Sequence, residues 1–329
     1  MKKLFPCISA MLAALTFGLA AQAAAQTPIK LTLGHNAAPG NPKAEGTLKF
    51  AELVKAKSNG RITVQVAGAA QLGEDLTMIS ALRTGTLDMS ANSQGPMSSV
   101  VPELAALGMP FLFANLQQAW ALLDGPIGQD LAKRFEAKNM VLIAWFDNGI
   151  RQTTNSKHPI AKPDDLKGLK IRTPADPVTV DMFQAMGAST QQINFSELYI
   201  ALQQGVVDGQ ENPLANIHSS KLHEVQKYMS MTNHKYESTP VLMSAITWKR
   251  LSDADRKLVR EAAAEATVFQ RKLVADSDEK LLAEYKSNPS VQVNSPDLAP
   301  FKAATKVVWD NWEKKPFGDF VRTLRSTVR

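Results

Sequence analysis

The sequence predicts a two-lobed α/β protein, and three observations support that prediction. Its 329 residues, 44% of them apolar, suffice for about two domains with packed cores. Strand-like runs alternate with helical patterns in two separate stretches, which is typical of a mainly parallel sheet covered by helices. The C-terminal third contains a long stretch without Gly or Pro, and we expect it to form one long helix or two nearly collinear ones.

The N-terminal segment, residues 1–25, has the three-part pattern of a secretory signal peptide. Lys2 and Lys3 precede an apolar run at 4–20, and small residues follow it. The run is too short for a comfortable membrane span, although an uncleaved anchor is the alternative. We expect cleavage near Ala25, or at a similar site slightly earlier, and therefore a mature protein in the periplasm.

The first unit is predicted from its periodicity, which switches between strand-like alternation and helical spacing of apolar residues. Its expected strands are 29–34, 61–67 and 87–91, and its expected helices are 42–58 and 75–84. A stretch rich in Pro, Gly and Met follows at 95–115, and after it we expect helices at 116–123 and 127–138 and a strand at 141–146. The βαβαβ order predicts a mainly parallel sheet.

The second unit repeats the alternation with strands at 169–173 and 206–210 and helices at 177–186 and 195–203. The long C-terminal helix should begin after the cap Ser252 and run to about Ser287. At 1.5 Å per residue it would be roughly 50 Å long, enough to brace both lobes. A last amphipathic helix is expected at 298–313.

The composition gives little support to an enzyme. The single cysteine, Cys7, lies in the signal peptide, so the mature chain has no thiol nucleophile, redox pair or zinc-thiolate site. His218 and His223 are poorly spaced for one helical face, and no HExxH motif occurs. P-loop, GxGxxG and GxSxG motifs are also missing, so we expect no metal, no cofactor and no catalytic activity.

The charge does not indicate a nucleic-acid-binding protein. The formal net charge is +6, and removing the two lysines of the signal peptide leaves 35 basic against 31 acidic side chains. Basic and acidic residues are interleaved, and no run of five or six basic residues occurs. No second apolar stretch of 18 residues follows the signal peptide, so we expect a soluble mature chain.

Polar residues at strand ends are the candidates for a binding site, because the carboxyl ends of parallel strands border the ligand crevice of α/β proteins. Arg172 ends one such strand, and its planar guanidinium matches a carboxylate, although a structural ion pair is an equal alternative. Arg151 follows the last strand of the first unit and should lie near the cleft or hinge. Asn36 follows the first strand, and Asn212 precedes a proline, where a helix cap is the simpler interpretation.

Together these segments resemble the substrate-binding subunits of tripartite ATP-independent periplasmic (TRAP) transporters, the dicarboxylate-binding-protein-like (DctP) family. The resemblance covers nearly the whole mature chain in order. It rests on LGHN at 33–36, QLGED at 71–75, NGIR at 148–151, GLKIR at 168–172, FSELYIALQ at 195–203 and VDGQENP at 207–213. The last three segments, at their spacing, are highly specific for the family.

The resemblance implies two α/β domains, joined by crossing strands and a long helix, that close on a ligand like a hinged clam. The implied boundaries are 26–148 with about 238–277 for domain I, and 149–237 with about 278–329 for domain II. The protein would be a monomer that captures an organic acid and passes it to a membrane permease without catalysis.

The resemblance also implies roles for individual residues. Arg172 would pair with the ligand carboxylate, Arg151 would be a second arginine near it, and Asn212 would help to hold it. Phe195 would pack near the ligand, while Asn36 and either Glu74 or Asp75 would face its far end.

The expected ligand is a hydroxylated monocarboxylate such as a uronate or an aldonate. Hydroxyl-binding groups and an aromatic wall are available from His35, Glu74, Asp75, Gln94, Trp145, Asp147, Tyr236 and Glu237. Sialic acid is disfavoured, because NSQGP at 92–96 lacks the acidic residue and nearby arginine of sialic-acid-binding relatives. A C4-dicarboxylate is the alternative, but it would need a second cation, for which the sequence offers only a protonated His35. A periplasmic enzyme acting on carboxylates and a sensory binding protein are further alternatives.

Overall fold

The computed structural model describes residues 27–328, so the predicted signal peptide and Cys7 lie outside the described residues. The strands are β1 (Ile29–Gly34), β2 (Ile62–Ala67), β3 (Met89–Ala91), β4 (Met140–Asn155), β5 (Lys170–Thr173), β6 (Ser189–Gln192), β7 (Gly209–Pro213), β8 (Tyr228–Ser244) and β9 (Gln292–Asn294).

The helices are α1 (Pro42–Lys57), α2 (Asp75–Thr84), α3 (Gln94–Met97), α4 (Leu116–Asp124), α5 (Pro126–Glu136), α6 (Pro177–Ala185), α7 (Leu198–Gln203), α8 (Leu214–Ser219), α9 (Ala245–Arg250), α10 (Asp253–Ser287), α11 (Ala299–Ala304), α12 (Lys306–Trp312) and α13 (Gly318–Thr327). Short 3₁₀ helices are η1 (Pro102–Gly108), η2 (Pro163–Leu166), η3 (Phe195–Glu197) and η4 (Leu222–Glu224).

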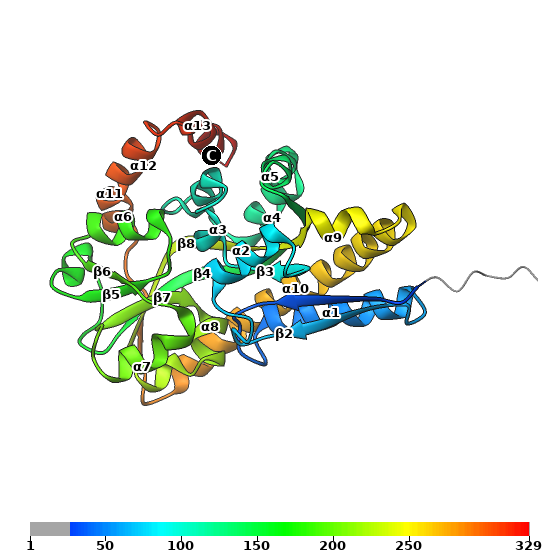
Figure 1. Ribbon diagram of the computed structural model, residues 1–329. Helices are drawn as coiled ribbons and strands as arrows, with labels where there is room; N and C mark the ends of the chain where they lie inside the picture. Colours follow the sequence, from blue (N-terminus) through cyan, green and yellow to red (C-terminus); the bar gives the residue numbers. More distant parts are fainter. Residues whose placement is uncertain (1–26, 329) are drawn as a thin grey trace, which may run out of the picture.

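One sheet of nine strands runs through the described part of the chain in the order β2-β1-β3-β8-β4-β7-β5-β6, with β9 beside β8 (Figure 1). The outer pairs β1–β2, β1–β3, β5–β6 and β5–β7 are parallel, as the sequence predicts. The two long central strands, β4 and β8, are antiparallel to each other and to the strands beside them in this order. They pass from the half that contains β1–β3, here called the first lobe, to the half that contains β5–β7, the second lobe.

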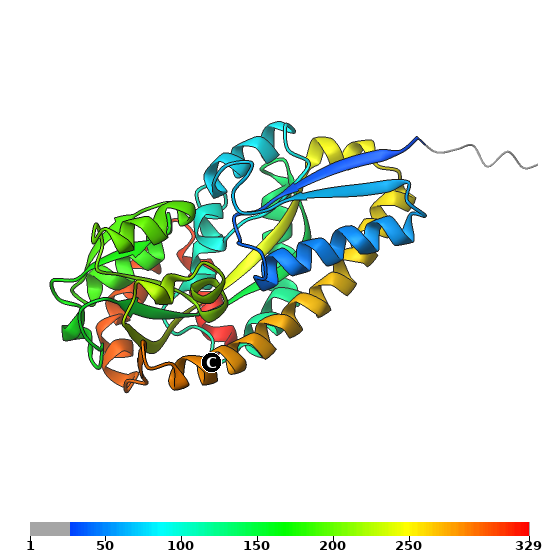
Figure 2. The same ribbon diagram turned by 90° about the horizontal axis from the view of Figure 1, so that it is seen from below.

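The long helix α10 confirms the prediction made from the stretch without Gly and Pro. The Ser252 side chain accepts a hydrogen bond from the Asp255 backbone N–H, as an N-cap does, and the helix continues for 35 residues. Figure 2 shows α10 running beneath both lobes from one end of the molecule to the other. It therefore connects the lobes as well as covering the sheet.

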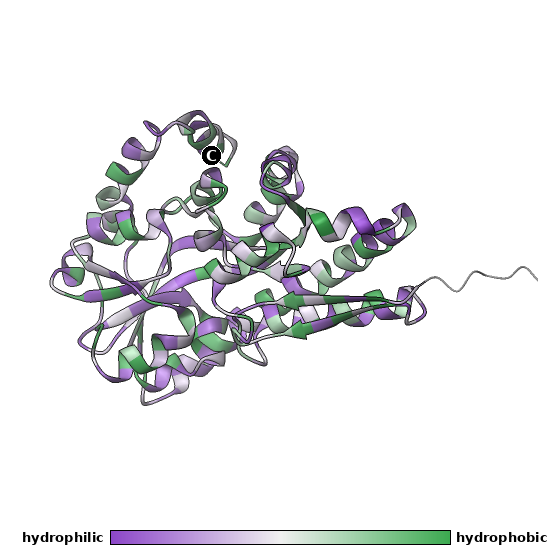
Figure 3. Cartoon of the chain, in the orientation of Figure 1, coloured by the Kyte–Doolittle hydropathy of each residue, from purple (hydrophilic) through white to green (hydrophobic). Residues whose placement is uncertain are grey.

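The central strands differ most from the prediction. β4 extends nine residues beyond the predicted strand at 141–146, and the 17-residue β8 was not predicted at all. Figure 3 shows hydrophilic residues along these strands where they pass between the lobes. They are buried although they are polar, so the apolar alternation that marks a strand is missing there.

Several smaller predictions were also wrong. Asn212 lies inside β7 and does not cap a helix, since α8 begins only at Leu214 and Pro213 precedes it. The last predicted helix is divided into α11 and α12, and α13 and β6 were not predicted. The predicted helix at 195–203 begins with the 3₁₀ turn η3 and continues as α7.

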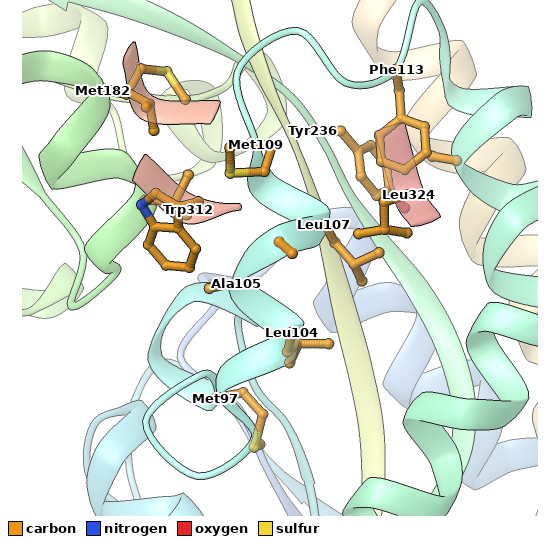
Figure 4. Close-up of a cluster of buried hydrophobic side chains, with 14 of the residues drawn as sticks. Met97, Leu104, Ala105, Leu107, Met109, Phe113, Met182, Tyr236, Trp312 and Leu324 are labelled. Atoms are coloured by element: carbon orange, nitrogen blue, oxygen red, sulfur yellow. The ribbon is translucent and has the colours of Figure 1, made fainter. Parts of the chain in front are cut away.

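The core is divided into clusters that follow the lobes. One cluster packs α1 and α10 against β1 in the first lobe, and another packs α7 and α8 against α10 in the second. The largest cluster joins η1, α6, α12 and α13, and Figure 4 shows Met182 and Trp312 on the same side of η1. Along residues 27–328, no helix combines the length and apolar character needed to cross a membrane.

Candidate functional site

A small cavity lies between the lobes and takes residues from both of them. Its volume is about 30 Å³, room for roughly two water molecules. The residues that line it are Asn36, Ala37, Lys43, Asp75, Ser93, Arg151, Arg172, Pro174, Phe195, Asn212, Asn216 and Glu237. A ligand larger than two waters therefore requires side-chain movement or a wider separation of the lobes.

Arg172 ends β5 and lies in the wall formed by the second lobe. It is only 3% exposed, and the hydrogen bond found for its guanidinium runs from Nε to the Ile193 carbonyl at 2.8 Å. The guanidinium carbon lies 5.8 Å from the centroid of the Phe195 ring. Among the described residues, no carboxylate oxygen comes within 4 Å of it, and burial lowers the pKa of Arg172 to about 10.

Arg151 has the opposite environment, although it lines the same cavity. It sits on β4 and forms ion pairs with both Glu211 and Glu237. Its Nη2 atom also donates to Glu211 Oε1 at 2.7 Å and to Asn212 Oδ1 at 3.1 Å. Burial alone would lower the pKa of Arg151, but the two carboxylates outweigh it and raise the pKa above its usual value.

The two glutamates are held in place from several sides. His234 Nε2 lies 3.1 Å from Glu211 Oε2, while Glu237 accepts hydrogen bonds from Asn148 Nδ2 at 3.2 Å and from the Gly95 N–H at 3.3 Å. Burial would raise the pKa of Glu211, but Arg151 and His234 lower it to about 2. Both carboxylates are thus ionised partners of Arg151.

The wall formed by the first lobe centres on Asp75, the first residue of α2. Its Oδ2 atom accepts from Asn36 Nδ2 at 3.0 Å, and its Oδ1 atom accepts from Asn92 Nδ2 at 2.8 Å. Lys43, in the first turn of α1, is also buried here, with Nζ 3.5 Å from Asn36 Oδ1 and 3.4 Å from Ser93 Oγ. This wall therefore offers hydrogen-bond donors and acceptors side by side.

Asparagine side chains connect the two lobes beside the cavity. Asn41, the N-cap of α1, donates through Nδ2 to Asn216 Oδ1 of α8 at 2.8 Å. Asn216 in turn donates to Asn212 Oδ1 at 3.1 Å and to Asn148 Oδ1 at 3.3 Å. Because both lobes contribute to this network, the cavity is complete only when the lobes are together.

Some of the residues singled out from the sequence line this cavity, and six do not: His35, Glu74, Gln94, Trp145, Asp147 and Tyr236. Arg172, Arg151, Asn212, Asn36 and Phe195 line it. Glu74 lies beside it and accepts a hydrogen bond from the Ser196 N–H across the lobes at 3.1 Å, leaving Asp75 as the cavity residue of that pair. Gln94 is buried behind the cavity, where its Oε1 atom accepts from the Ser238 N–H and hydroxyl.

Tyr236 lies in the core rather than in the cavity. Its ring contacts Phe113 edge-to-face, with centroids 5.2 Å apart. Figure 4 shows the two rings beside each other. Successive side chains of a strand point to opposite faces, so Glu237 faces the cavity while Tyr236 points away from it. Tyr236 therefore does not line the cavity, and its expected role in ligand binding stays a prediction.

His35 cannot serve as the second cation considered from the sequence. Its ring is buried, and Nδ1 accepts a hydrogen bond from the Ala37 N–H at 3.1 Å. Burial and the nearby Lys43 lower the pKa of His35 to about 4, so the ring is neutral at ordinary pH. The cation on this side is Lys43, which sequence reasoning missed. A lysine in the first turn of a helix opposes the helix dipole, and this signal could have identified it.

The comparisons with known proteins agree on one family. The model of the bacterial extracellular solute-binding proteins, family 7 (DctP), matches residues 33–315. An uncharacterised protein of Sinorhizobium fredii, y4mM, is 57% identical over 288 residues; these are 88% of this chain but 53% of the relative, so the chain spans about half its length. The 2,3-diketo-L-gulonate-binding periplasmic protein of Escherichia coli is 33% identical, with 84% of this chain and 82% of the relative covered.

Solved structures give the same result. A TRAP periplasmic solute-binding protein from a Polaromonas species, bound to D-erythronate, is 35% identical with a TM-score of 0.87 and covers 91% of this chain and 98% of its own. The sugar-acid-binding protein of Advenella mimigardefordensis, in complex with galactonate, is 31% identical with a TM-score of 0.89. The match covers 92% of this chain and 98% of that protein's chain. A TRAP protein of Sulfurospirillum deleyianum with bound succinate is 31% identical with a TM-score of 0.87, covering 92% and 99%.

Proposed function

The chain belongs to the bacterial extracellular solute-binding proteins of family 7, the carboxylate-binding subunits of TRAP transporters, and from this premise we propose that it captures a hydroxylated monocarboxylate such as an aldonate or a uronate. The family and its structural neighbours are substrate-binding proteins of transport systems and not enzymes. We therefore propose that the site recognises and encloses its ligand without a chemical step.

The observation that carries the proposal is the environment of Arg172. A buried guanidinium without a carboxylate partner is unfavourable, because the charge has lost its water and gained only one backbone acceptor. A ligand carboxylate would supply the missing counter-charge in a planar geometry that the guanidinium matches. Phe195 would hold the guanidinium in place through its ring, and Asn212 and Arg151 would line the same side of the cavity.

The nature of the first-lobe wall supports a hydroxylated ligand. Asn36, Asp75 and Ser93 present neutral or acidic oxygens and amide donors, which suit hydroxyl groups. Relatives that bind D-erythronate, galactonate or 2,3-diketo-L-gulonate support the same class. A C4-dicarboxylate is the second candidate, because Lys43 places a cation on this wall and a succinate-bound relative shares the fold.

We propose that ligand capture proceeds by closure of the two lobes. The proposed lobes are 27–148 with about 238–277, and 149–237 with about 278–317. We assign α13 to the first lobe, since it packs on η1 and Arg134 of α5 lies over its Phe320 ring. On closure the carboxylate bound at Arg172 would leave bulk water, and its attraction to the guanidinium would strengthen as the local dielectric constant falls.

The further steps follow from family membership. We propose that the protein is exported by the signal peptide at 1–25, acts as a monomer in the periplasm, and delivers its ligand to the membrane permease subunits of its transporter. Transport and sensing could be separated by deleting the gene and measuring uptake and induced transcription independently.

The test is a ligand screen on the purified mature protein, followed by calorimetry on an Arg172 variant. A thermal-shift panel of aldonates, uronates, keto acids and dicarboxylates should raise the melting temperature with at least one acid, because a ligand that binds only the folded state stabilises it. Arg172→Ala should weaken the binding of that acid by about 2–5 kcal/mol, and Arg172→Lys should weaken it measurably as well. Arg83→Lys, at an exposed position on α2, is the control. Unchanged affinity in both Arg172 variants would refute the assignment.

A further inference from the structure

We propose that Lys43 and Asp75 together select the ligand, by holding a hydroxyl oxygen on the first-lobe side of the cavity and disfavouring a second carboxylate there. This inference rests on the proposed function, in which Arg172 of the second lobe binds the ligand carboxylate. The two residues lie on α1 and α2, and the cavity separates them from β5, which carries Arg172.

The ammonium group of Lys43 uses little of its hydrogen-bonding capacity within the protein. Its side chain is 3% exposed, and its ammonium has only two long hydrogen bonds, of 3.5 Å to Asn36 and 3.4 Å to Ser93. An ammonium carries three donors, and among the described residues no carboxylate oxygen lies within 4 Å of Nζ. Its place in the first turn of α1 also sets a positive charge against the positive end of the helix dipole. An oxygen atom of a ligand in the cavity would satisfy this ammonium.

Asp75, in contrast, is firmly positioned. Asn36 and Asn92 donate to its two oxygens, the Ser93 N–H donates at 3.3 Å, and its place at the start of α2 agrees with the helix dipole. A carboxylate has about four acceptor sites, so Asp75 can still accept a hydrogen bond from the cavity. Asn36 couples the pair, because its Nδ2 donates to Asp75 and its Oδ1 faces Lys43.

The charges on the two sides of the cavity differ in a way that selects a ligand. On the second-lobe side, Arg172 is an uncompensated cation that attracts one carboxylate. On the first-lobe side, Lys43 would attract a second carboxylate, but Asp75 would repel it. A hydroxyl group can hydrogen-bond to both residues, because its oxygen accepts from the Lys43 ammonium while its O–H donates to the Asp75 carboxylate. A site built to bind a hydroxyl rejects a ligand that lacks it, because its own polar groups are then left unpaired.

The experiment compares acids of equal carbon number on the purified mature chain by titration calorimetry. The pairs are D-erythronate with succinate and galactonate with galactarate, each a hydroxylated monocarboxylate and a dicarboxylate. The wild-type protein should prefer the monocarboxylate of at least one pair by about tenfold or more. Lys43→Met should reduce that acid's affinity about tenfold or more, and Asp75→Asn should shift the preference toward the dicarboxylate. Lys55→Met, at an exposed position on α1, should change neither the affinity for the monocarboxylate nor the preference for it over the dicarboxylate.

Two outcomes separate this inference from the proposed function. If Arg172→Lys weakens binding while Lys43→Met and Asp75→Asn leave the ratio of affinities at its wild-type value, only the selectivity inference is overturned. If both Arg172→Ala and Arg172→Lys leave the affinity unchanged, or no aldonate or uronate of the thermal-shift panel binds, the proposed ligand class itself fails. Thermal unfolding adds a second readout: Lys43→Met should unfold at the wild-type temperature or above it, and a clear fall would indicate a structural role instead.

Discussion

Arg151 and Arg172 line one cavity, but the two guanidinium groups have different surroundings and therefore different roles. Arg151 is enclosed by Glu211 and Glu237, so its charge is used within the protein. Arg172 has a backbone carbonyl and an aromatic ring beside it, so its charge is directed at the cavity. The same side chain therefore fixes the central strands at one position and is available to a ligand at the other.

This difference predicts unequal effects of the two substitutions on stability. Arg151→Met leaves two buried carboxylates without their cation and should lower the free energy of unfolding by about 3–5 kcal/mol. Arg172→Met removes a buried charge that lacks a carboxylate partner, so the ligand-free protein should lose far less, or become more stable. Urea unfolding of the matched pair measures both effects. Equal losses would contradict the distinction drawn between the two arginines.

Membership of the cavity could be predicted from the sequence for residues that belong to a motif, as for Arg172, Asn36 and Phe195. It could not be predicted where strand register decides which side chain faces the cavity. Tyr236 and Glu237 are neighbours in the sequence and point to opposite faces of the same strand, and both are buried. The pairing of β8 with β4 decides which of the two side chains faces the cavity, and no local sequence pattern shows that pairing.

At the scale of elements, β4 is held to α10 where it leaves the first lobe. Gln270 of α10 accepts from the Asp147 N–H at 2.8 Å and donates to the Asp147 carbonyl at 2.7 Å, beside a register shift in the β4–β8 pairing. The carboxyl of Asp147 accepts from Trp120 Nε1, while its Oδ1 atom has no partner among the described residues. A buried carboxyl thus stands at the point where the two lobes join.

The pH dependence of stability should report on this junction. Burial raises the pKa of Asp147 to about 7, with Asp278 adding to the effect and Trp120 and Arg271 opposing it. Burial likewise raises the pKa of Asp278 to about 7. In the unfolded chain both carboxyls ionise near pH 4, so the folded state binds more protons between about pH 4 and 7. The stability contributed by these groups is complete below that window and is lost as the pH rises through it.

Asp147→Asn should therefore reduce the fall in unfolding free energy between pH 5 and pH 8 by about 1 kcal/mol or more, as measured by urea denaturation. The buried His35 acts in the opposite direction below pH 6.5, because burial lowers its pKa, so the difference between variant and wild type is the quantity to compare. Asp276→Asn, at an exposed position on α10, is the control. Identical pH profiles for wild type and Asp147→Asn would contradict the prediction.

The elements of the two lobes could be predicted because local signals agree with the fold. Asn41 caps α1, Gly85 ends α2 in the left-handed conformation, and Ser252 caps α10. β8 could not be predicted, since its burial depends on polar partners supplied by distant segments: Gln94 for Ser238, and Asp176 for Lys235. The elements that pass between the lobes were therefore the hardest to find from local patterns.

For the whole molecule, the contact between the lobes is close enough to leave no space for a side chain at one position. Gly95 lies in α3 of the first lobe, and a Cβ atom added there would fall 2.6 Å from the Cβ atom of Asp176, the N-cap of α6. The Gly95 N–H also donates to Glu237. Backbone of one lobe thus packs directly on a side chain of the other, as a closed arrangement requires.

Gly95→Ala should consequently hinder closure of the lobes, because the added Cβ atom would meet the Asp176 side chain of the second lobe. We expect ligand affinity to fall about tenfold or more, mainly through faster dissociation. Small-angle scattering with saturating ligand should give a larger radius of gyration than the wild type. Gly125→Ala is the matched control, since its added Cβ would meet only atoms of the preceding helix, at 3.2 Å and beyond. A Gly95→Ala protein that binds and compacts like the wild type would show that this contact does not govern closure, and would place the moving surfaces elsewhere between the lobes.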